Sequence, residues 1–374
     1  MIVLTVNTGS SSVRLAAFET DGGALTRAAS GHFSGDWNEP AAMLRAFLQG
    51  HGIEAVAAVA HRIVHGGARL TAPCRIDDTV EAEIERLAPL APLHNPRALE
   101  WIRACRTLLR AQTAQVAVFD TAFYADLPEV AATYALPRAL SARHGIRRYG
   151  FHGLAHEAMA RRWRELKPEL AKGGRVISLQ LGAGCSVTAV RAGRAIDTSM
   201  GFSPLEGLVM ATRSGDVDPG LLLYLQRAEG LAPERMERLL NEESGLLGLS
   251  GASGDMRALL EADDAEAKRA VDVYCYRARK YIGAYLAALG GADAILFGGG
   301  VGEQAPAVRA QMLSGLEGLG IALDDKANRA AIGAEMCISR GSGAVAVWVV
   351  PVDEAAILAQ AAHEAIGIQE EERS

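Results

Sequence analysis

Residues 1–18 read MIVLTVNTGSSSVRLAAF, and this stretch decides how the chain can fold. Apolar runs at 2–6 and 13–18 flank the polar turn 7–12, which is the pattern of a β-hairpin. Gly9 lets the backbone approach a ligand closely, and the hydroxyl side chains add donors to the backbone N–H groups. The turn therefore suits a phosphate group, although an ordinary polar hairpin turn would show the same pattern.

The same pattern recurs at 176–190, where the sequence reads VISLQLGAGCSVTAV. A weaker repeat links VAAVAHRIVHGG (56–67) with GADAILFGGGVGEQ (291–304), each an apolar strand followed by paired glycines. Internal repeats of this kind indicate an architecture built from similar units. We therefore expect an α/β fold with two duplicated lobes and a nucleotide bound between them.

Length and composition narrow the class of protein. The chain has 374 residues, which suggests two domains, and its 49% hydrophobic and 22% charged residues can form ordinary cores. A net charge of −6 argues against nucleic acid as a partner, so an anionic substrate must be held by local arginines. The five cysteines stand singly, unlike those of disulfide frameworks or zinc sites. No apolar run reaches the ~20 residues that span a bilayer and no signal-peptide pattern is present, so we expect a cytoplasmic protein without membrane contact.

Periodicity predicts alternating strands and helices, as in an α/β domain. Helices are expected at 41–49, 77–87, 96–111, 153–166, 220–229, 234–242, 256–261, 265–289 and 354–366, and further strands at 56–64, 115–119, 294–297 and 345–350. The glycine run 298–302 should precede a helix. The long irregular stretch 197–219 is predicted to be functional, since structureless loops of this length in compact domains usually are.

Charged residues at strand ends are candidates for chemistry, because ligands of α/β sheets gather beyond the carboxyl ends of strands. Arg62 could grip a carboxylate or phosphate through two parallel hydrogen bonds, or form a structural salt bridge. Asp120 could position a metal or a nucleophile, or cap the next helix. Glu354 has the same ambiguity, since Asp353 and Glu354 also suit a helix N-terminus.

Other polar residues lie in loops. His152 and His94 are catalytic or structural, whereas Arg213, inside the long loop, is predicted to face a ligand. The basic groups Arg143, Arg147, Arg148 and Arg161, Arg162, Arg164 are interpreted as solvated faces. The glycine run resembles a nucleotide-binding turn, but the chain has neither the P-loop pattern nor a dinucleotide fingerprint.

Taken together, these residues resemble the acetate kinases, members of the actin-like sugar-kinase and heat-shock ATPase superfamily. The resemblance runs nearly end to end through NTGSSS (7–12), AHRIVHGG (60–67), APLHNP (91–96), VFDTAF (118–123), RRYGFHG (147–153), DTSMGFSPLEGLVMATRSGDVDP (197–219), SGLLGLSG (244–251) and SGDMR (253–257). It implies a two-lobed actin-like, ribonuclease H-like ATPase fold with the nucleotide in the interdomain cleft. The first lobe would comprise 1–120 plus 355–374, and the second 121–354. It also implies reversible transfer of the ATP γ-phosphoryl group to acetate, giving acetyl phosphate and ADP, with Mg²⁺ or Mn²⁺ and in a homodimer.

The resemblance also implies roles for individual residues. Asn7 and Glu354 match metal-associated positions, Arg62 the carboxylate-binding arginine and Asp120 the catalytic aspartate. His152 and Arg213 match positions that stabilise the transition state, and His94 lies nearby. Val64, Leu93, Phe151 and Pro204 match the apolar pocket for the acetate methyl group. The nucleotide-binding segments correspond to Gln180, Leu181, Gly182, Ala183, Gly184, Asp255, Met256, Arg257, Gly300, Val301, Gly302, Glu303 and Gln304, and Arg14 stands where the family usually has Lys.

The second hairpin departs from the family pattern. Where the family usually reads HLGNG, this chain has Gln180-Leu181-Gly182-Ala183-Gly184, and GGGVGEQ (298–304) replaces TAGIGEN. The preferred phosphoryl donor therefore stays open. A kinase for propionate or another short acid and a non-catalytic nucleotide-binding regulator are the alternatives. Val64 favours the smaller acetate, because an added methylene must find room. Direct in-line transfer is our mechanistic hypothesis.

Overall fold

The computed structural model describes residues 1–9, 12–21, 24–34, 39–341 and 343–371. Ser10 and Ser11 of the first predicted phosphate turn lie outside these residues. The chain forms two compact units. The first comprises Met1–Ala125, Phe151–Leu154 and Asp353–Ser374, and the second Asp126–Gly150 and Ala155–Val352. The predicted lobe boundaries at 120 and 354 stay a prediction, since compactness alone does not define a domain.

The first unit is a mixed sheet with the strand order β3-β2-β1-β4-β6-β5. The strands β1, β4 and β6 run parallel, and the β1–β2, β2–β3 and β5–β6 pairs are antiparallel. Its elements are β1 (Ile2–Thr8), β2 (Ser12–Asp21), β3 (Ala24–Ser34), α1 (Pro40–Gly50), β4 (Ala58–Ile63), β5 (Cys74–Arg75), α2 (Asp78–Arg86), η1 (Ala88–Leu90), α3 (Asn95–Leu108), β6 (Ala114–Phe119), η2 (Ala122–Tyr124) and α15 (Glu354–Glu371).

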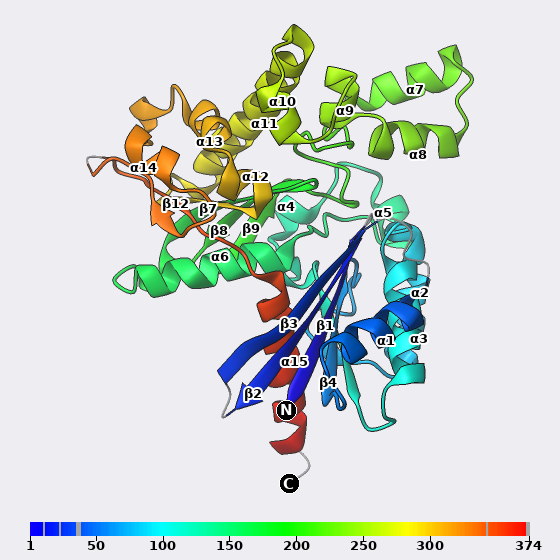
Figure 1. The fold of residues 1–374 in the computed structure, drawn as a ribbon. Coiled ribbons are helices and arrows are strands. Elements are labelled where there is room, and N and C mark those ends of the chain that lie inside the picture. Colours follow the sequence, from blue (N-terminus) through cyan, green and yellow to red (C-terminus); the bar gives the residue numbers. More distant parts are fainter. Residues whose placement is uncertain (10–11, 22–23, 35–38, 342, 372–374) are drawn as a thin grey trace. The chain divides into compact units, whose positions relative to one another are not determined.

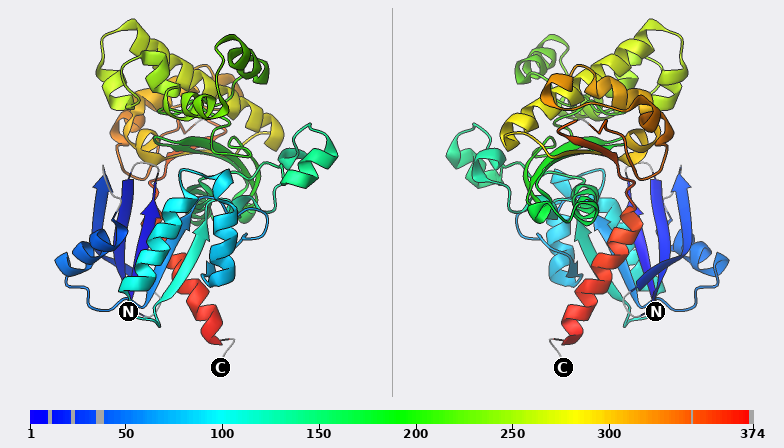
Figure 2. Two further views of the ribbon diagram at one scale, coloured as in Figure 1. Left: turned by 90° about the vertical axis from the view of Figure 1, so that its right-hand side faces the viewer. Right: turned by 90° about the vertical axis from the view of Figure 1, so that its left-hand side faces the viewer.

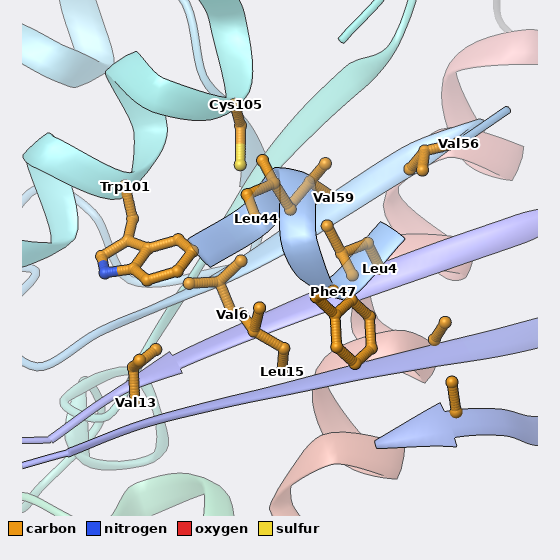
Figure 3. Close-up of a cluster of buried hydrophobic side chains, with 12 residues drawn as sticks. Leu4, Val6, Val13, Leu15, Leu44, Phe47, Val56, Val59, Trp101 and Cys105 are labelled. Carbon is orange, nitrogen blue, oxygen red and sulfur yellow. The ribbon is translucent and has the colours of Figure 1, made fainter. Parts of the chain in front are cut away.

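Strand alternation assigns the two faces of this sheet to different helices. Leu4 and Val6 of β1 point to one face, where they pack with Leu44 of α1 and Trp101 of α3 (Figure 3). Val3 points to the other face, which α15 covers along its length (Figure 1; Figure 2). Burying side chains of this size stabilises the unit by roughly 2 kcal/mol each.

The second unit is a mixed sheet with the order β11-β12-β10-β7-β8-β9. His156 of α6 contacts one face of this sheet through Ser178 and Ser186, and Tyr274 of α11 reaches Cys185 from the other face. Its elements are α4 (Glu129–Ala132), α5 (Arg138–His144), α6 (Gly153–Leu166, whose first two residues belong to the first unit), η3 (Ala171–Gly173), β7 (Arg175–Leu181), β8 (Cys185–Arg191), β9 (Arg194–Thr198), α7 (Pro219–Ala228), α8 (Pro233–Glu242), α9 (Gly245–Ser250), α10 (Met256–Glu261), α11 (Ala265–Leu289), β10 (Ala294–Gly298), α12 (Gly299–Gln304), α13 (Pro306–Leu313), η4 (Glu317–Leu319), α14 (Asp325–Ala330), β11 (Met336–Cys337) and β12 (Ala346–Val349).

The two sheets have the same topology. In the second sheet, β7–β8, β8–β9 and β11–β12 are antiparallel and β7, β10 and β12 are parallel, so each strand has a counterpart of the same direction in the first. The hairpins predicted at 1–18 and 176–190 are β1–β2 and β7–β8, and the weaker repeat is β4 and β10. The predicted duplication is therefore confirmed.

The glycine run 298–302 differs from its prediction. It forms the start of α12 instead of a turn before a helix, because α12 begins at Gly299. Gly299 has φ +75°, and a Cβ there would lie 2.7 Å from the Leu181 carbonyl oxygen. Only glycine lets the helix begin so close to β7. The last helix also extends to Glu371, five residues further than the alanine-rich pattern indicated.

Among the described residues, no helix is both long enough and apolar enough to cross a membrane.

His61 of β4 gives the first unit a specific sensitivity to acid. Burial lowers the pKa of this histidine from 6.5 to about 4, although its hydrogen bond with Gln115 opposes the shift. A lowered pKa means that the folded state favours the neutral ring. The contribution of His61 to the stability of the fold is therefore fully present above pH 6.5, the pKa in the unfolded chain. We expect the free energy of unfolding to decrease by up to about 3 kcal/mol as the pH falls through 6.5 to about 4.

Urea unfolding at several pH values, followed by tryptophan fluorescence, tests this expectation. The variant His61→Asn should lose less stability over this pH range than the unmodified chain, because asparagine does not titrate. The matched control is His32→Asn, which replaces an exposed histidine on β3. Parallel pH curves for His61→Asn and the unmodified chain would contradict the assignment.

Candidate active site

Three polar residues of the first unit lie at neighbouring strand ends. Asn7, Arg62 and Asp120 fall at or just beyond the carboxyl ends of β1, β4 and β6, which are adjacent and parallel. Val3, Ala60 and Val118 of the same three strands pack in the core under α15. The polar residues each lie two or four positions further along their strand, and side chains at such spacings point to the same face of a sheet. The three polar side chains therefore lie on the face that α15 covers. The sheet therefore gathers them at one edge, where α15 begins.

Arg62 is the centre of this group. Its Nε lies 3.0 Å from Asp120 Oδ1 and its Nη2 lies 2.6 Å from Asp120 Oδ2, so the pair is bidentate. Its Nη1 donates to Asn7 Oδ1 at 3.0 Å. Exposure of the side chain is 13% for Arg62 and 2% for Asp120, so water screens the pair weakly. We call Asn7, Arg62, Asp120 and Glu354 the Arg62 cluster.

Glu354 adds a second carboxylate to the Arg62 cluster. Its Oε2 accepts a hydrogen bond from Asn7 Nδ2 at 2.7 Å. Burial alone would raise the pKa of Glu354, but the Arg62 guanidinium and the Asn7 hydrogen bond hold it below its usual range. Burial would likewise lower the pKa of Arg62, but Asp120 and Glu354 raise it above its ordinary value. The Glu354 carboxylate and the Arg62 guanidinium are therefore both ionised around neutral pH.

His152 and Arg14 lie close enough to act on this charge. Both side chains contribute to the lowered pKa of Glu354, after burial and the stronger effects of the cluster. Arg14 pairs with Asn7 across the β1–β2 hairpin and is exposed. His152 has φ +58°, and the next residue, Gly153, donates its N–H to the Asp120 carbonyl at 3.0 Å. A Cβ at residue 153 would lie 2.1 Å from that oxygen, so glycine is needed for this contact.

The residues predicted to line the methyl pocket differ in exposure. Val64 and Phe151 are buried, at 5% and 1% exposure, whereas Leu93 is 37% exposed. The Phe151 ring packs edge-on against His65, and its carbonyl accepts a hydrogen bond from the Tyr124 hydroxyl at 2.9 Å. His94 stands directly before α3, at the N-cap position. Pro204, the fourth predicted pocket residue, belongs to the second unit.

In the second unit, Arg213 lies in the irregular stretch between β9 and α7. Its Nη1 donates to the Pro204 carbonyl at 3.2 Å. Neighbouring backbone groups hold the stretch on α9: the amide of Ser244 donates to the Thr212 carbonyl at 2.9 Å, and a Cβ at Gly245 would lie 2.3 Å from the Met210 carbonyl. The predicted functional loop is therefore closely packed on its neighbours.

Two of the three predicted nucleotide segments, 180–184 and 255–257, approach Ala211 of this stretch. Its amide donates to the Ala183 carbonyl in the β7–β8 turn at 2.9 Å, and a Cβ at Gly254 would lie 2.8 Å from its carbonyl. The predicted nucleotide residue Asp255 follows directly and caps α10 through the Arg257 amide. Burial raises the pKa of the Cys185 thiol to about 11, and the nearby positive charge of Arg213 acts in the opposite direction.

The third predicted nucleotide segment, at the start of α12, contains both exposed and buried residues. Gly300 is exposed and a Cβ there would meet nothing within 4 Å, whereas Gly302 is buried. Glu303 accepts hydrogen bonds from the amides of Gly299 at 2.9 Å and Val352 at 3.3 Å. Its carboxylate therefore holds the beginning of α12, and the backbone at Gly300 is the part open to a ligand.

Arg148 contradicts its interpretation as part of a solvated face. Its side chain is 17% exposed and its Nη2 donates to Glu206 Oε1 at 2.7 Å. A partly buried arginine is stabilised by a carboxylate partner, and the partner of Arg148 lies 58 residues further along the chain. No local pattern could have indicated the pairing.

Comparison with known proteins places the chain in a family. The Acetokinase family model matches residues 35–360. An acetate kinase of Solibacter usitatus (strain Ellin6076) is 48% identical over 309 residues, which are 82% of this chain and 75% of that protein. An acetate kinase of Clavibacter michiganensis subsp. michiganensis (strain NCPPB 382) is 44% identical over 383 residues, 94% of this chain and 96% of that protein. The chain belongs to the acetokinase family.

Solved structures agree with this membership. The acetate kinase of Porphyromonas gingivalis is 38% identical with a TM-score of 0.88, over 98% of this chain and 99% of that one. A propionate kinase of Francisella tularensis subsp. tularensis SCHU S4 is 33% identical with a TM-score of 0.87, over 97% and 99%. The chain thus has the duplicated actin-like fold of the acetokinase family, and it is a kinase that transfers a phosphoryl group to a carboxylate.

The donor set of the Arg62 cluster suits a hard cation. Within the described part of the chain, no three His, Cys, Asp or Glu side chains gather in a way that could hold a metal ion alone. Mg²⁺ keeps several waters and typically takes one or two carboxylates together with substrate phosphates. The Glu354 carboxylate beside the Asn7 amide fits such a sparse site, which also suits the metal dependence of acetokinase reactions.

The Arg62–Asp120 pair should be strongly coupled in stability. A double-mutant cycle with Arg62→Ala, Asp120→Ala and the double variant should give a coupling free energy of about 3 kcal/mol, because each single change leaves a poorly solvated charge without its partner. The matched control is the bidentate but exposed pair Arg235–Glu243, for which we expect less than about 1 kcal/mol. Equal coupling for both pairs, measured by urea unfolding, would refute the expectation.

Proposed function

We propose that the chain catalyses the reversible transfer of the γ-phosphoryl group of ATP to acetate, giving acetyl phosphate and ADP, with Arg62 as the acetate-binding residue. The observation that carries this role is the Arg62 cluster. Its guanidinium is held in one orientation by Asp120 and Asn7, at the carboxyl edge of a parallel set of strands.

Arg62 retains the capacity to bind a carboxylate. A guanidinium has five N–H donors. Hydrogen bonds within the described residues use one on Nε, one on Nη1 and one on Nη2. One donor is left on each terminal nitrogen, and such a pair can bind both oxygens of a carboxylate.

The remaining roles follow the chemistry of phosphoryl transfer, which needs positioning and charge neutralisation more than covalent help. Asn7 and Glu354 would hold Mg²⁺, which supplies positive charge against the phosphate oxygens when bound. Asp120 fixes Arg62, and His152 and Arg213 neutralise charge that develops on the transferring group. We propose direct in-line transfer, for which inversion of configuration at a chirally labelled phosphorus is expected.

Acetate is proposed as the preferred acid. Val64 and Phe151 are buried, and a pocket lined by such packed side chains would favour the smaller acid, although one extra methylene changes selectivity by only ~1–3 kcal/mol. The structural similarity to a propionate kinase keeps propionate as the second candidate. A hydroxamate assay with acetate, propionate and butyrate decides between them, and absence of product with every acid would leave a nucleotide-binding regulator.

We propose further that the protein acts in the cytoplasm as a homodimer. Exposed apolar side chains on and just before α7 support a self-association surface, namely Val217, Leu221, Leu223 and Tyr224.

Arg213 should matter for catalysis more than for binding. The variant Arg213→Ala should lower kcat about a hundredfold while KM for ATP stays within about twofold, since its charge is needed mainly in the transition state. Initial rates of acetyl phosphate formation measure both constants. Arg227→Ala, an exposed arginine on α7, is the control. An unchanged kcat for Arg213→Ala would remove this residue from the reaction.

The departures in the second hairpin should affect the nucleotide. Restoring the usual residues with Gln180→His and Ala183→Asn should lower KM for ATP by about threefold to tenfold, because both changes alter side-chain donors near the phosphates. KM for acetate should not change. Ala192→Asn, in the β8–β9 turn, is the matched control. A change in KM for acetate alone would show that this hairpin does not contact the nucleotide.

A further inference from the structure

Arg213 rests on a turn that is held by an internal group of polar side chains. The turn is 201–207, and we call Tyr134, Arg148 and Glu206 the Tyr134 cluster. All of these residues belong to the second unit. Arg213 contacts the turn through the Pro204 carbonyl, which accepts a hydrogen bond from its Nη1 at 3.2 Å. The position of the guanidinium therefore depends on how this turn is fixed.

A single hydroxyl group fixes both sides of Pro204. The Tyr134 hydroxyl accepts a hydrogen bond from the Phe202 amide at 2.8 Å, two residues before Pro204. The same hydroxyl donates to the Glu206 carboxylate, two residues after it. Because one oxygen atom links both flanks, its loss removes one hydrogen bond from each side of the segment that carries the Pro204 carbonyl.

Arg148 completes the cluster. It donates to Glu206 Oε1 at 2.7 Å and to the Thr198 carbonyl at 3.1 Å, and its guanidinium lies 5.5 Å from the centre of the Tyr134 ring. It thereby links the turn to the end of β9. Burial and the neighbouring Glu206 raise the pKa of Tyr134, so its hydroxyl keeps the proton that it donates.

The turn packs closely against the Tyr134 cluster at Gly201. A Cβ at Gly201 would lie 1.6 Å from Glu206 Oε2 and 2.0 Å from the Tyr134 hydroxyl oxygen. The amide of Tyr149 donates to the Gly201 carbonyl at 3.0 Å, which fixes the start of the turn to the segment that carries Arg148. The cluster is therefore built into the turn, and its side chains are partly buried.

We propose that Tyr134 is a positioning residue for phosphoryl transfer, whose hydroxyl sets the Pro204 carbonyl and through it the Arg213 guanidinium. The inference rests on the proposed role of Arg213. A displacement of about 1 Å in such a group can lower a rate strongly without weakening ground-state binding. The cluster thus acts on kcat and not on substrate affinity.

Tyr134→Phe is the decisive variant, because it removes the hydroxyl and keeps the ring beneath Arg148. We expect kcat to fall about tenfold, with KM for ATP and for acetate within about twofold. Tyr276→Phe, which removes an exposed hydroxyl on α11, should leave the kinetics unchanged. Should Tyr134→Phe fail to fold in a thermal melt, Glu206→Gln weakens the same turn, and a lower kcat at unchanged KM is again expected.

A double-mutant cycle separates this inference from the proposed function. In the Arg213→Ala background, Tyr134→Phe should change kcat by less than about twofold, because no guanidinium is left to position. A full tenfold loss in that background, or no loss in the unmodified chain, overturns the positioning role of Tyr134 and leaves that of Arg213 intact. If Arg213→Ala itself keeps its kcat, both roles fall.

Discussion

The paired charges of Arg62 and Asp120 are the interaction on which the first unit's chemistry depends. A buried ion pair contributes little net stability, since the desolvation of both ions offsets most of their attraction. Apolar side chains at these strand ends would hold the sheet equally well. The pair instead fixes a guanidinium that also contacts Asn7, and Asn7 in turn binds Glu354 at the start of α15. The first unit thus carries a charged guanidinium in a fixed orientation at a place where folding does not require one.

Duplication supplies two similar sheets, but their strand ends carry different chemistry. β1, β4 and β6 carry Asn7, Arg62 and Asp120 at or just beyond their carboxyl ends, whereas their counterparts β7, β10 and β12 end at the uncharged residues Leu181, Gly298 and Val349, and β10 leads into the glycine run. Charged side chains suit the grip of a small carboxylate, and glycines suit close approach of backbone to a larger ligand. The asymmetry arises from side chains alone, because the topology of the two sheets is the same.

Much of this fold follows from local pattern. The alternation of 1–18 and 176–190 predicts both hairpins, and α6, α10 and α11 have the bounds that periodicity indicates. The roles of some charged residues cannot be read from the local sequence, because their hydrogen-bond partners lie far along the chain. Asp353 accepts from the Ala356 amide and caps α15, which leaves the Glu354 carboxylate for Asn7. The same holds for Arg148, whose partner Glu206 lies 58 residues along the chain, so that the local sequence indicates a solvated face instead.

The second hairpin shows how far side chains can change around a retained backbone. Its turn is closed by the Gly182 amide on the Gly184 carbonyl at 3.0 Å, and the Ala183 carbonyl is held by Ala211. Cys185 packs inward, with its Sγ near the Gly182 carbonyl. None of these contacts needs the side chains that differ from the family pattern at 180 and 183. Backbone N–H groups recognise phosphate through geometry and not through residue identity, so the backbone of this turn is compatible with the nucleotide role that we propose for it.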